Sequence, residues 1–129
     1  MLDGHPLIAF ATTAQPAQAL AFYRDVLGLP LVADEHFALV FDAHGTMLRI
    51  AKMNDFTPRP GTVVGWQVDD IRAMVAALMI MGVTFERYPG MPQDEWGIMT
   101  FPERSKVAWF KDPDGNTLSL TQFPQAITP

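Results

Sequence analysis

Residues 21–29 read Ala21-Phe22-Tyr23-Arg24-Asp25-Val26-Leu27-Gly28-Leu29 and end the first helix that the sequence predicts. That helix extends from about Gln15 to Leu27, with Pro16 in its first turn and Gly28 directly after its end, which is the usual placing of these residue types. Its apolar side chains recur at spacings of three and four residues, so one face is predicted to be buried. The apolar segment 31–33 follows at once and is predicted to be a strand.

The second half of the chain repeats this order of helix, glycine and strand. Its helix is predicted from about Asp70 to Met81, with an aspartate as the N-cap and Gly82 as the stop. A linker rich in proline and glycine, 54–61, separates module one, about 7–53, from module two, about 62–123. The predicted strands are 7–12, 31–33, 37–41, 47–52, 63–68, 84–88, 99–101, 107–110 and 117–121.

Composition indicates a single globular domain. The chain has 129 residues, of which 49% are hydrophobic and 18% charged, so residues 1–129 are expected to form one domain. The formal net charge is −5 and no cluster of Lys or Arg occurs, which argues against a nucleic-acid partner. No apolar run approaches the roughly 20 residues that span a bilayer, and the first residues lack a signal-peptide pattern, so we expect a cytoplasmic protein without a membrane partner. The absence of cysteine excludes a disulfide and a thiol nucleophile.

Three motifs carry a resemblance to a known family. Residues 21–29 resemble the end of the first helix in the vicinal-oxygen-chelate superfamily, which contains glyoxalases, bleomycin resistance proteins and extradiol dioxygenases. Residues 68–71, Val-Asp-Asp-Ile, resemble the junction of strand and helix in its second module, and residues 109–116, Trp-Phe-Lys-Asp-Pro-Asp-Gly-Asn, resemble the hairpin before its last strand. The resemblance implies an α+β fold in which two βαβββ modules form a cup-shaped mixed sheet with helices on its outer face. It also implies a small-molecule ligand in the cup and a homodimer.

The positions of the metal ligands are the most informative part of the resemblance. Metal enzymes of that superfamily hold one divalent ion on four inward-facing side chains, and these positions map onto Ile8, Arg49, Val63 and Ser119. Isoleucine and valine have no atom that can coordinate a metal, arginine would repel the ion, and serine is a poor neutral ligand. No two of the three histidines share a strand or a helical i,i+4 spacing. The sequence therefore predicts no metal and no cofactor.

The alternation of side chains along a strand predicts what faces into the cup instead. If the mapped positions point inward, so do Phe10, Gln67 and Trp109, which gives a mostly apolar pocket with Arg49 as its fixed cation and Ser119 as a neutral polar group. Such a lining suits an aromatic or flat apolar ligand, and Arg49 can hold a carboxylate or phosphate through two parallel hydrogen bonds. The alternative is that Arg49 is a solvated surface residue and that Gln67 and Trp109 are ordinary sheet residues.

The segment 88–98 contains two glycines and two prolines and is predicted to be a long excursion between strands. Such excursions often serve as binding loops. Trp96 would then contact the ligand at the mouth of the cup, and Asp94 or Glu95 would be a general base if it were buried. The alternatives are an acidic solvated loop and an arm that packs on a dimer partner.

Three hypotheses about function remain open. The leading hypothesis is a metal-independent protein that sequesters an apolar or aromatic small molecule, comparable to the drug-sequestering branch of the superfamily. The alternative is an enzyme of the same superfamily, a lyase, isomerase or dioxygenase, that uses a non-standard metal site or the acids Asp94, Glu95 or Glu103. An effector-binding or structural module is a third hypothesis. The candidate ligand-binding residues are Phe10, Arg49, Gln67, Trp96, Trp109 and Ser119, and no catalytic residue is identified.

Overall fold

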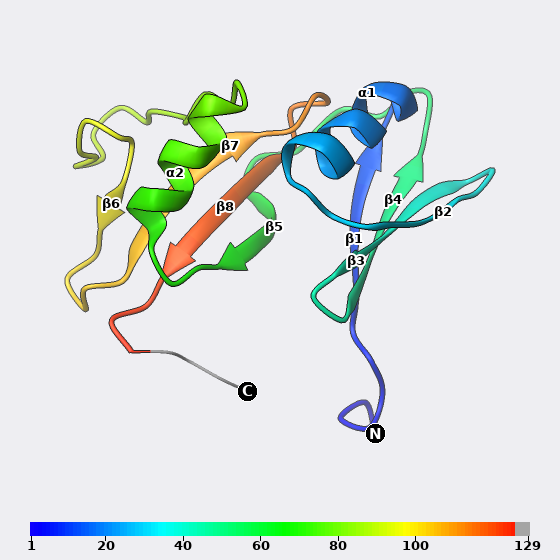
Figure 1. Ribbon diagram of the computed structural model, residues 1–129, viewed down its shortest axis with the longest axis horizontal. Coiled ribbons are helices and arrows are strands. Elements are labelled where there is room, and N and C mark those ends of the chain that lie inside the picture. The colour runs from blue at the N-terminus through cyan, green and yellow to red at the C-terminus, as the bar shows by residue number, and fades with distance from the viewer. Residues whose placement is uncertain (126–129) are drawn as a thin grey trace. The chain divides into compact units, whose positions relative to one another are not determined.

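The computed structural model describes residues 1–125 and divides into two compact units (Figure 1). The first unit comprises residues 1–63 together with 112–116, and the second comprises 64–111 and the residues from Thr117 onward. Each unit is built on one four-stranded sheet, which confirms the predicted α+β class. Within the described residues, no helix is both long enough and apolar enough to cross a membrane.

The first sheet has the strand order β1-β4-β3-β2. β1 is parallel to β4, whereas the β2–β3 and β3–β4 pairs are antiparallel, so the sheet is mixed. In the turn between β3 and β4, Asp42 Oδ1 accepts a hydrogen bond from the backbone N–H of Gly45 over 2.8 Å. Gly45 has a φ of 89°, a value that glycine adopts without strain. The strands are β1 (Ile8–Thr13), β2 (Leu31–Asp34), β3 (Ala38–Ala43) and β4 (Thr46–Lys52).

The first predicted helix forms as two consecutive pieces, α1 (Pro16–Ala21) and η1 (Phe22–Val26). η1 is wound more widely than an α-helix, because the N–H of Leu27 donates to the carbonyl of Phe22, five residues earlier, over 2.9 Å. The chain leaves this turn at Gly28, which has a φ of 75°. Tyr23 of η1 is completely buried, and its ring centre lies 5.8 Å from that of Phe41 on β3. This contact packs the helical segment on the first sheet.

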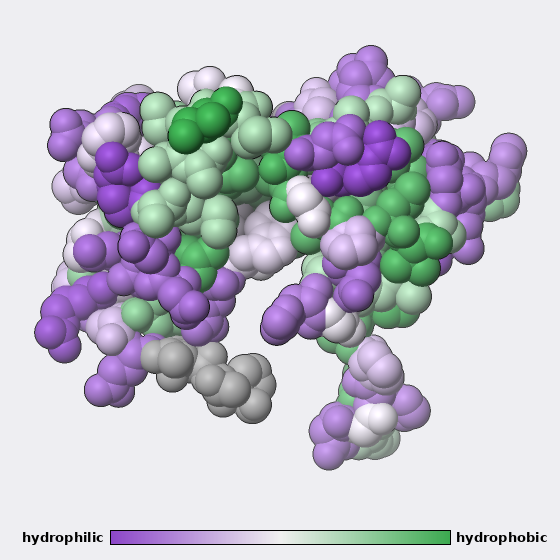
Figure 2. Space-filling view, in the orientation of Figure 1, coloured by the Kyte–Doolittle hydropathy of each residue, from purple (hydrophilic) through white to green (hydrophobic). Residues whose placement is uncertain are grey.

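The second sheet repeats this arrangement with the order β5-β8-β7-β6. α2 (Ile71–Ile80) contacts β7 and β8 (Figure 1), and the buried side chains of Val75 and Phe110 belong to the core of this unit. The outer side of α2 keeps exposed apolar residues, including Ile80 and Met79, and Figure 2 shows green surface over this helix. The strands are β5 (Thr62–Gln67), β6 (Met99–Thr100), β7 (Lys106–Lys111) and β8 (Thr117–Gln122).

The prediction of a strand at 84–88 is wrong. Phe85 makes only an isolated bridge to Phe110, and the Gln93 side chain occupies the backbone groups that a neighbouring strand would need. Gln93 Nε2 donates to the carbonyl of Glu86 over 2.8 Å, and its Oε1 accepts from the N–H of Tyr88 over 2.8 Å. Gln93 Nε2 also donates to a carbonyl within the same loop, that of residue 97, over 2.9 Å. One glutamine therefore ties the loop 88–98 together in place of a ladder of strand hydrogen bonds.

The turn that joins β7 to β8, residues 112–116, is confirmed, and it belongs to the first unit. Asp112 is buried, and its Oδ2 accepts hydrogen bonds from the Tyr23 hydroxyl over 2.7 Å and from Asn116 Nδ2 over 2.8 Å. Asn116 Nδ2 also donates to the carbonyl of Thr12 on β1 over 2.8 Å. Asp114 accepts from the hydroxyl of Thr13 and, over 2.8 Å, from the backbone N–H of residue 14. The turn is therefore bonded to both β1 and η1.

Candidate functional site

One face of the first sheet is apolar and open to solvent. Phe10 of β1 is in register with Arg49 of β4, and Ile8 is in register with Met47, so these four side chains share a face. The exposed fractions are 57% for Phe10, 43% for Ile8 and 41% for Met47, whereas Leu48, which points to the other face, is fully buried. Large apolar side chains rarely gather at the surface without a binding role. This face is therefore the first candidate site.

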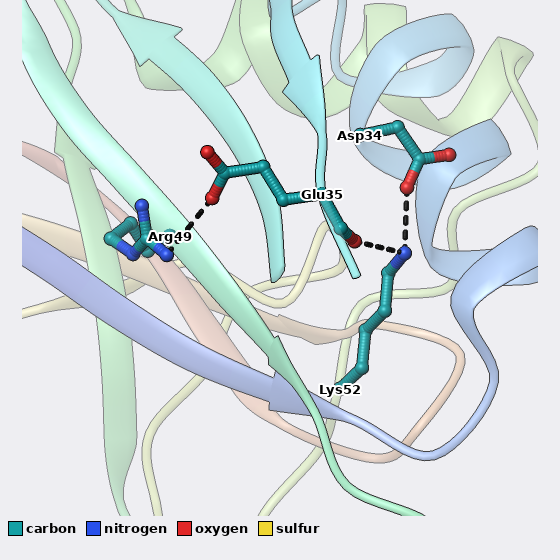
Figure 3. Close-up of polar contacts among 4 residues, drawn as sticks. All are labelled: Asp34, Glu35, Arg49 and Lys52. Carbon is teal, nitrogen blue, oxygen red and sulfur yellow. Dashed lines mark hydrogen bonds and ion pairs between the residues drawn. The ribbon is translucent and has the colours of Figure 1, made fainter. Parts of the chain in front are cut away.

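Arg49 is the cation in this row of side chains. Its Nη2 donates to Glu35 Oε1 over 3.1 Å, and the two side chains are 31% and 50% exposed (Figure 3). Glu35 directly follows β2. Its backbone carbonyl accepts from Lys52 Nζ over 2.7 Å, and the same ammonium lies 2.6 Å from Asp34 Oδ1. The candidate face thus presents an aromatic ring, two aliphatic side chains and one exposed ion pair.

Sequence reasoning missed Glu35 as a partner of Arg49. The contact depends on the strand order, because β3 lies between β2 and β4. The side chain of Glu35 must cross the face of β3 to reach the guanidinium. The only signal in the sequence is the pair of acids at 34 and 35 directly after a predicted strand, and that signal does not identify which cation they meet.

The second sheet brings three more of the predicted residues onto one face. Trp109 of β7 is in register with Ser119 of β8, and the ring of Tyr88 meets Trp109 edge-on at 5.5 Å. A Cβ placed on Gly65 of β5 would lie 2.5 Å from Ser119 Oγ, so Gly65 covers this serine, which is only 7% exposed. Gln67, two residues after Gly65, shares its face of the strand and is exposed. Ser119 is the least accessible of the predicted contacts.

Trp96 lies apart from these residues in the second unit. The guanidinium carbon of Arg72 lies 3.4 Å from the centre of its ring, a stacked cation–π contact. Both residues line a depression of about 580 Å³ that begins at the start of α2 and includes neither Trp109 nor Ser119. Four carboxylates also line it, at positions 69, 70, 94 and 95. Trp96 therefore does not join the sheet residues with which it was grouped.

The three acids that the enzyme hypothesis offers as alternatives, Asp94, Glu95 and Glu103, are all exposed. Asp94 Oδ1 accepts hydrogen bonds from the backbone N–H groups of Trp96 and Ile98, both over 2.9 Å, so it holds the loop. The hydroxyl of Ser105 donates to Glu103 and lowers the pKa of that carboxyl. A general base with a raised pKa needs burial, and neither these two acids nor Glu95 has it.

The residues present do not fit the metal that the resemblance implies. The mapped positions lie on β1, β4, β5 and β8, and they offer no donor atom at Ile8 and Val63, a cation at Arg49 and one covered hydroxyl at Ser119. Among residues 1–125, no group of three or more His, Cys, Asp or Glu side chains is placed to hold a metal ion.

Comparison with known proteins identifies what the chain is similar to. A family model described as the Glyoxalase/Bleomycin resistance protein/Dioxygenase superfamily matches residues 5–120. No curated protein matches.

Solved structures share the fold over nearly the whole chain. Lactoylglutathione lyase from Agrobacterium tumefaciens has a TM-score of 0.72 at 19% identity, covering 95% of this chain and 96% of that one. A superfamily member from Sphaerobacter thermophilus has a TM-score of 0.69 at 23% identity, covering 92% and 98%. A glyoxalase/bleomycin resistance protein/dioxygenase from Alicyclobacillus acidocaldarius has a TM-score of 0.69 at 16% identity, covering 97% and 96%. At these identities the likeness concerns the fold alone.

Proposed function

The chain belongs to the glyoxalase/bleomycin resistance protein/dioxygenase superfamily, and from that premise we propose that it captures an apolar or aromatic small molecule with an acidic group, without a metal. The observation that carries the proposal is the pairing of Phe10 with Arg49 on an exposed sheet face. An aromatic ligand that packs on Phe10 gains about 0.5–1.5 kcal/mol beyond the area that it buries. The adjacent guanidinium can hold its carboxylate through two parallel hydrogen bonds.

The donor groups of the candidate residues support capture rather than turnover. Ile8 and Val63 carry no metal-coordinating atom, and the candidate acids 94, 95 and 103 are exposed. A lyase, isomerase or dioxygenase would need at least one activated acid, base or ion at its reacting atoms. Binding a ligand without converting it requires complementary shape and charge, and it needs no activated acid, base or ion.

The remaining candidate contacts all lie in the second unit, and we propose them as ligand contacts of that unit by itself. On the second sheet we assign ligand contact to Trp109 and Gln67, with Ser119 beneath them. Trp96 is assigned a separate contact, in the depression that it lines together with Arg72. Each of these assignments is testable by a single substitution.

Homodimer formation and a cytoplasmic location complete the proposal. β1 ends the strand order of the first sheet and β5 that of the second, and sheet edges readily pair with another chain. Sedimentation equilibrium over a range of concentrations tests the dimer, and fractionation of the source cells tests the location.

A titration with indole-3-propionate, an aromatic carboxylate, tests the function. We expect the largest NMR shifts at backbone amides of β1 and β4. Arg49→Met should weaken binding about fivefold, since an exposed charge contact contributes up to about 1 kcal/mol. Arg24→Met is the matched control, because Arg24 also lies in an exposed ion pair of the first unit, with Asp25.

Equal affinities in the Arg49→Met variant and the wild type would contradict the assignment of Arg49. Conversion of the probe or of other aromatic acids into a new product, followed by mass spectrometry, would contradict capture without turnover.

A further inference from the structure

The contact between Arg49 and Glu35 occupies the cation on which the proposed function depends. Within the described residues, the 3.1 Å hydrogen bond between them is the only one that either side chain makes. A guanidinium has five N–H donors, so a ligand carboxylate can form two parallel hydrogen bonds with Arg49 where Glu35 forms one. Exposed pairs of this kind contribute only about 0.2–1 kcal/mol. A ligand anion that forms two parallel hydrogen bonds can therefore displace Glu35.

Displacement does not remove Glu35 from the neighbourhood, because its backbone is held on both sides. Its N–H donates to the carbonyl of Ala38 over 2.8 Å, and its own carbonyl accepts from Lys52 Nζ over 2.7 Å. Lys52 also bonds to Asp34 over 2.6 Å, as Figure 3 shows. The ammonium of Lys52, which lies beside Glu35, is thus already paired with another acid.

A carboxylate left without a partner beside a bound anion repels that anion. A ligand that carries only an acidic group therefore gains the contact with Arg49 but meets an unpaired Glu35. A ligand that also carries an ammonium group can satisfy both residues at once. Arg49 and Glu35 then bind two ligand charges of opposite sign, at the edge of the apolar surface formed by Ile8, Phe10 and Met47.

We propose that Glu35 is a specificity-determining residue that makes this face prefer dipolar aromatic ligands over aromatic anions. The proposal rests on the proposed function and deepens it, because it names the ligand class: an aromatic body, an acidic group for Arg49 and a positively charged donor for Glu35. Glu35 competes with a plain anion and assists a dipolar ligand.

The test compares two probes that share one ring system and differ in charge. Tryptophan carries a carboxylate and an ammonium, whereas indole-3-propionate carries the carboxylate alone. The full chain, isotope-labelled, is titrated with each probe while the amides of β1 and β4 are followed by NMR. In the Glu35→Gln variant we expect the affinity for indole-3-propionate to rise about two- to fivefold, and that for tryptophan to fall by a similar factor.

Asp34→Asn is the matched control, because it removes the same charge one residue away, from a side chain that pairs with Lys52 rather than Arg49. We expect it to change the two affinities by the same small factor. An unchanged ratio of the two affinities in Glu35→Gln would overturn the proposal, and so would equal effects of the two variants.

Arg49→Met separates this proposal from the proposed function. If both probes bind that variant as tightly as the wild type, the proposed function fails. If binding requires Arg49 but Glu35→Gln leaves the ratio unchanged, only the role of Glu35 fails. If neither probe shifts the amides of β1 and β4 in any variant, both fail.

Discussion

Tyr23 donates its hydroxyl hydrogen to Asp112 over 2.7 Å inside the first unit, where the tyrosine is fully buried. Burial, with the adjacent carboxylate of Asp112, raises the pKa of Tyr23 well above its ordinary value of 10.0. A phenolate there would lose its water and face a second negative charge. Asp112 Oδ1 accepts two further hydrogen bonds, from the backbone N–H groups of Asp114 and Asn116. The hydroxyl of Tyr23 therefore completes the set of donors around a buried charge.

Tyr23→Phe should destabilise the protein by about 1–3 kcal/mol near neutral pH, because Asp112 loses one donor while it stays buried. Alkaline pH supplies a second signature. Above about pH 10 an unfolded tyrosine releases its proton while Tyr23 keeps it in the folded protein, so the free energy of unfolding falls as pH rises. The fall approaches about 1.4 kcal/mol per pH unit.

Urea unfolding of the wild type and of Tyr23→Phe, over the range from neutral to alkaline pH, measures both effects. The stability difference between the two proteins should shrink above about pH 10. A constant difference across that range would show that Tyr23 ionises as easily in the folded state as in the unfolded one.

At the scale of elements, α2 begins with two of its free backbone amides bonded to side chains. Asp70 Oδ1 accepts from the N–H of Ala73 over 3.0 Å, which makes Asp70 the N-cap. Gln122 Oε1, at the end of β8, accepts from the N–H of Ile71 over 2.8 Å. One bond is local and the other comes from the adjacent sheet, so the start of the helix is fixed from two sides.

Asp70→Ala should lower the free energy of unfolding by about 1 kcal/mol, the usual cost of removing an N-cap side chain. Asp69→Ala is the control, because Asp69 is the adjacent exposed acid and loses the same charge without being the cap. Urea unfolding followed by circular dichroism compares the two variants. Equal losses would mean that charge near the helix start, rather than the cap, stabilises α2.

The sequence predicted the helices and turns well because their signals are local. Pro16, Gly28 and Gly82 mark the helix ends through backbone preferences that need no tertiary partner. The strand predicted at 84–88 failed because its apolar residues carry the same pattern whether a strand or the side chain of Gln93 satisfies the backbone.

The candidate site was only partly predictable for the same reason. The alternation along each strand placed Phe10 and Arg49 on one face, and the sheet register agrees. Glu35 reaches Arg49 only because β3 separates β2 from β4, which no local pattern encodes. That these residues bind a ligand stays a prediction.

At the scale of the whole molecule, the mapped ligand positions lack suitable metal donors, so we expect the protein to bind no divalent ion tightly. Protein purified without chelator and without tag histidines should contain far less than one divalent ion per chain by elemental mass spectrometry. Manganese, nickel, iron, zinc and cobalt should leave its melting temperature unchanged, since an ion that binds only the folded state would raise it. About one retained ion per chain would contradict this expectation and make the enzyme hypothesis the leading one.

The chain passes between the two units three times, after residues 63, 111 and 116, and the five residues of the turn 112–116 belong to the unit that the N-terminal half builds. A gene fragment that stops in the linker 54–61 would encode every strand of the first sheet and still omit Asp112. Its product would leave the hydroxyl of Tyr23 in the core with no acceptor. Anyone who divides the protein for fragment complementation should therefore find that the first half folds poorly alone, and that a short peptide spanning 109–119 restores it better than any addition at the cut.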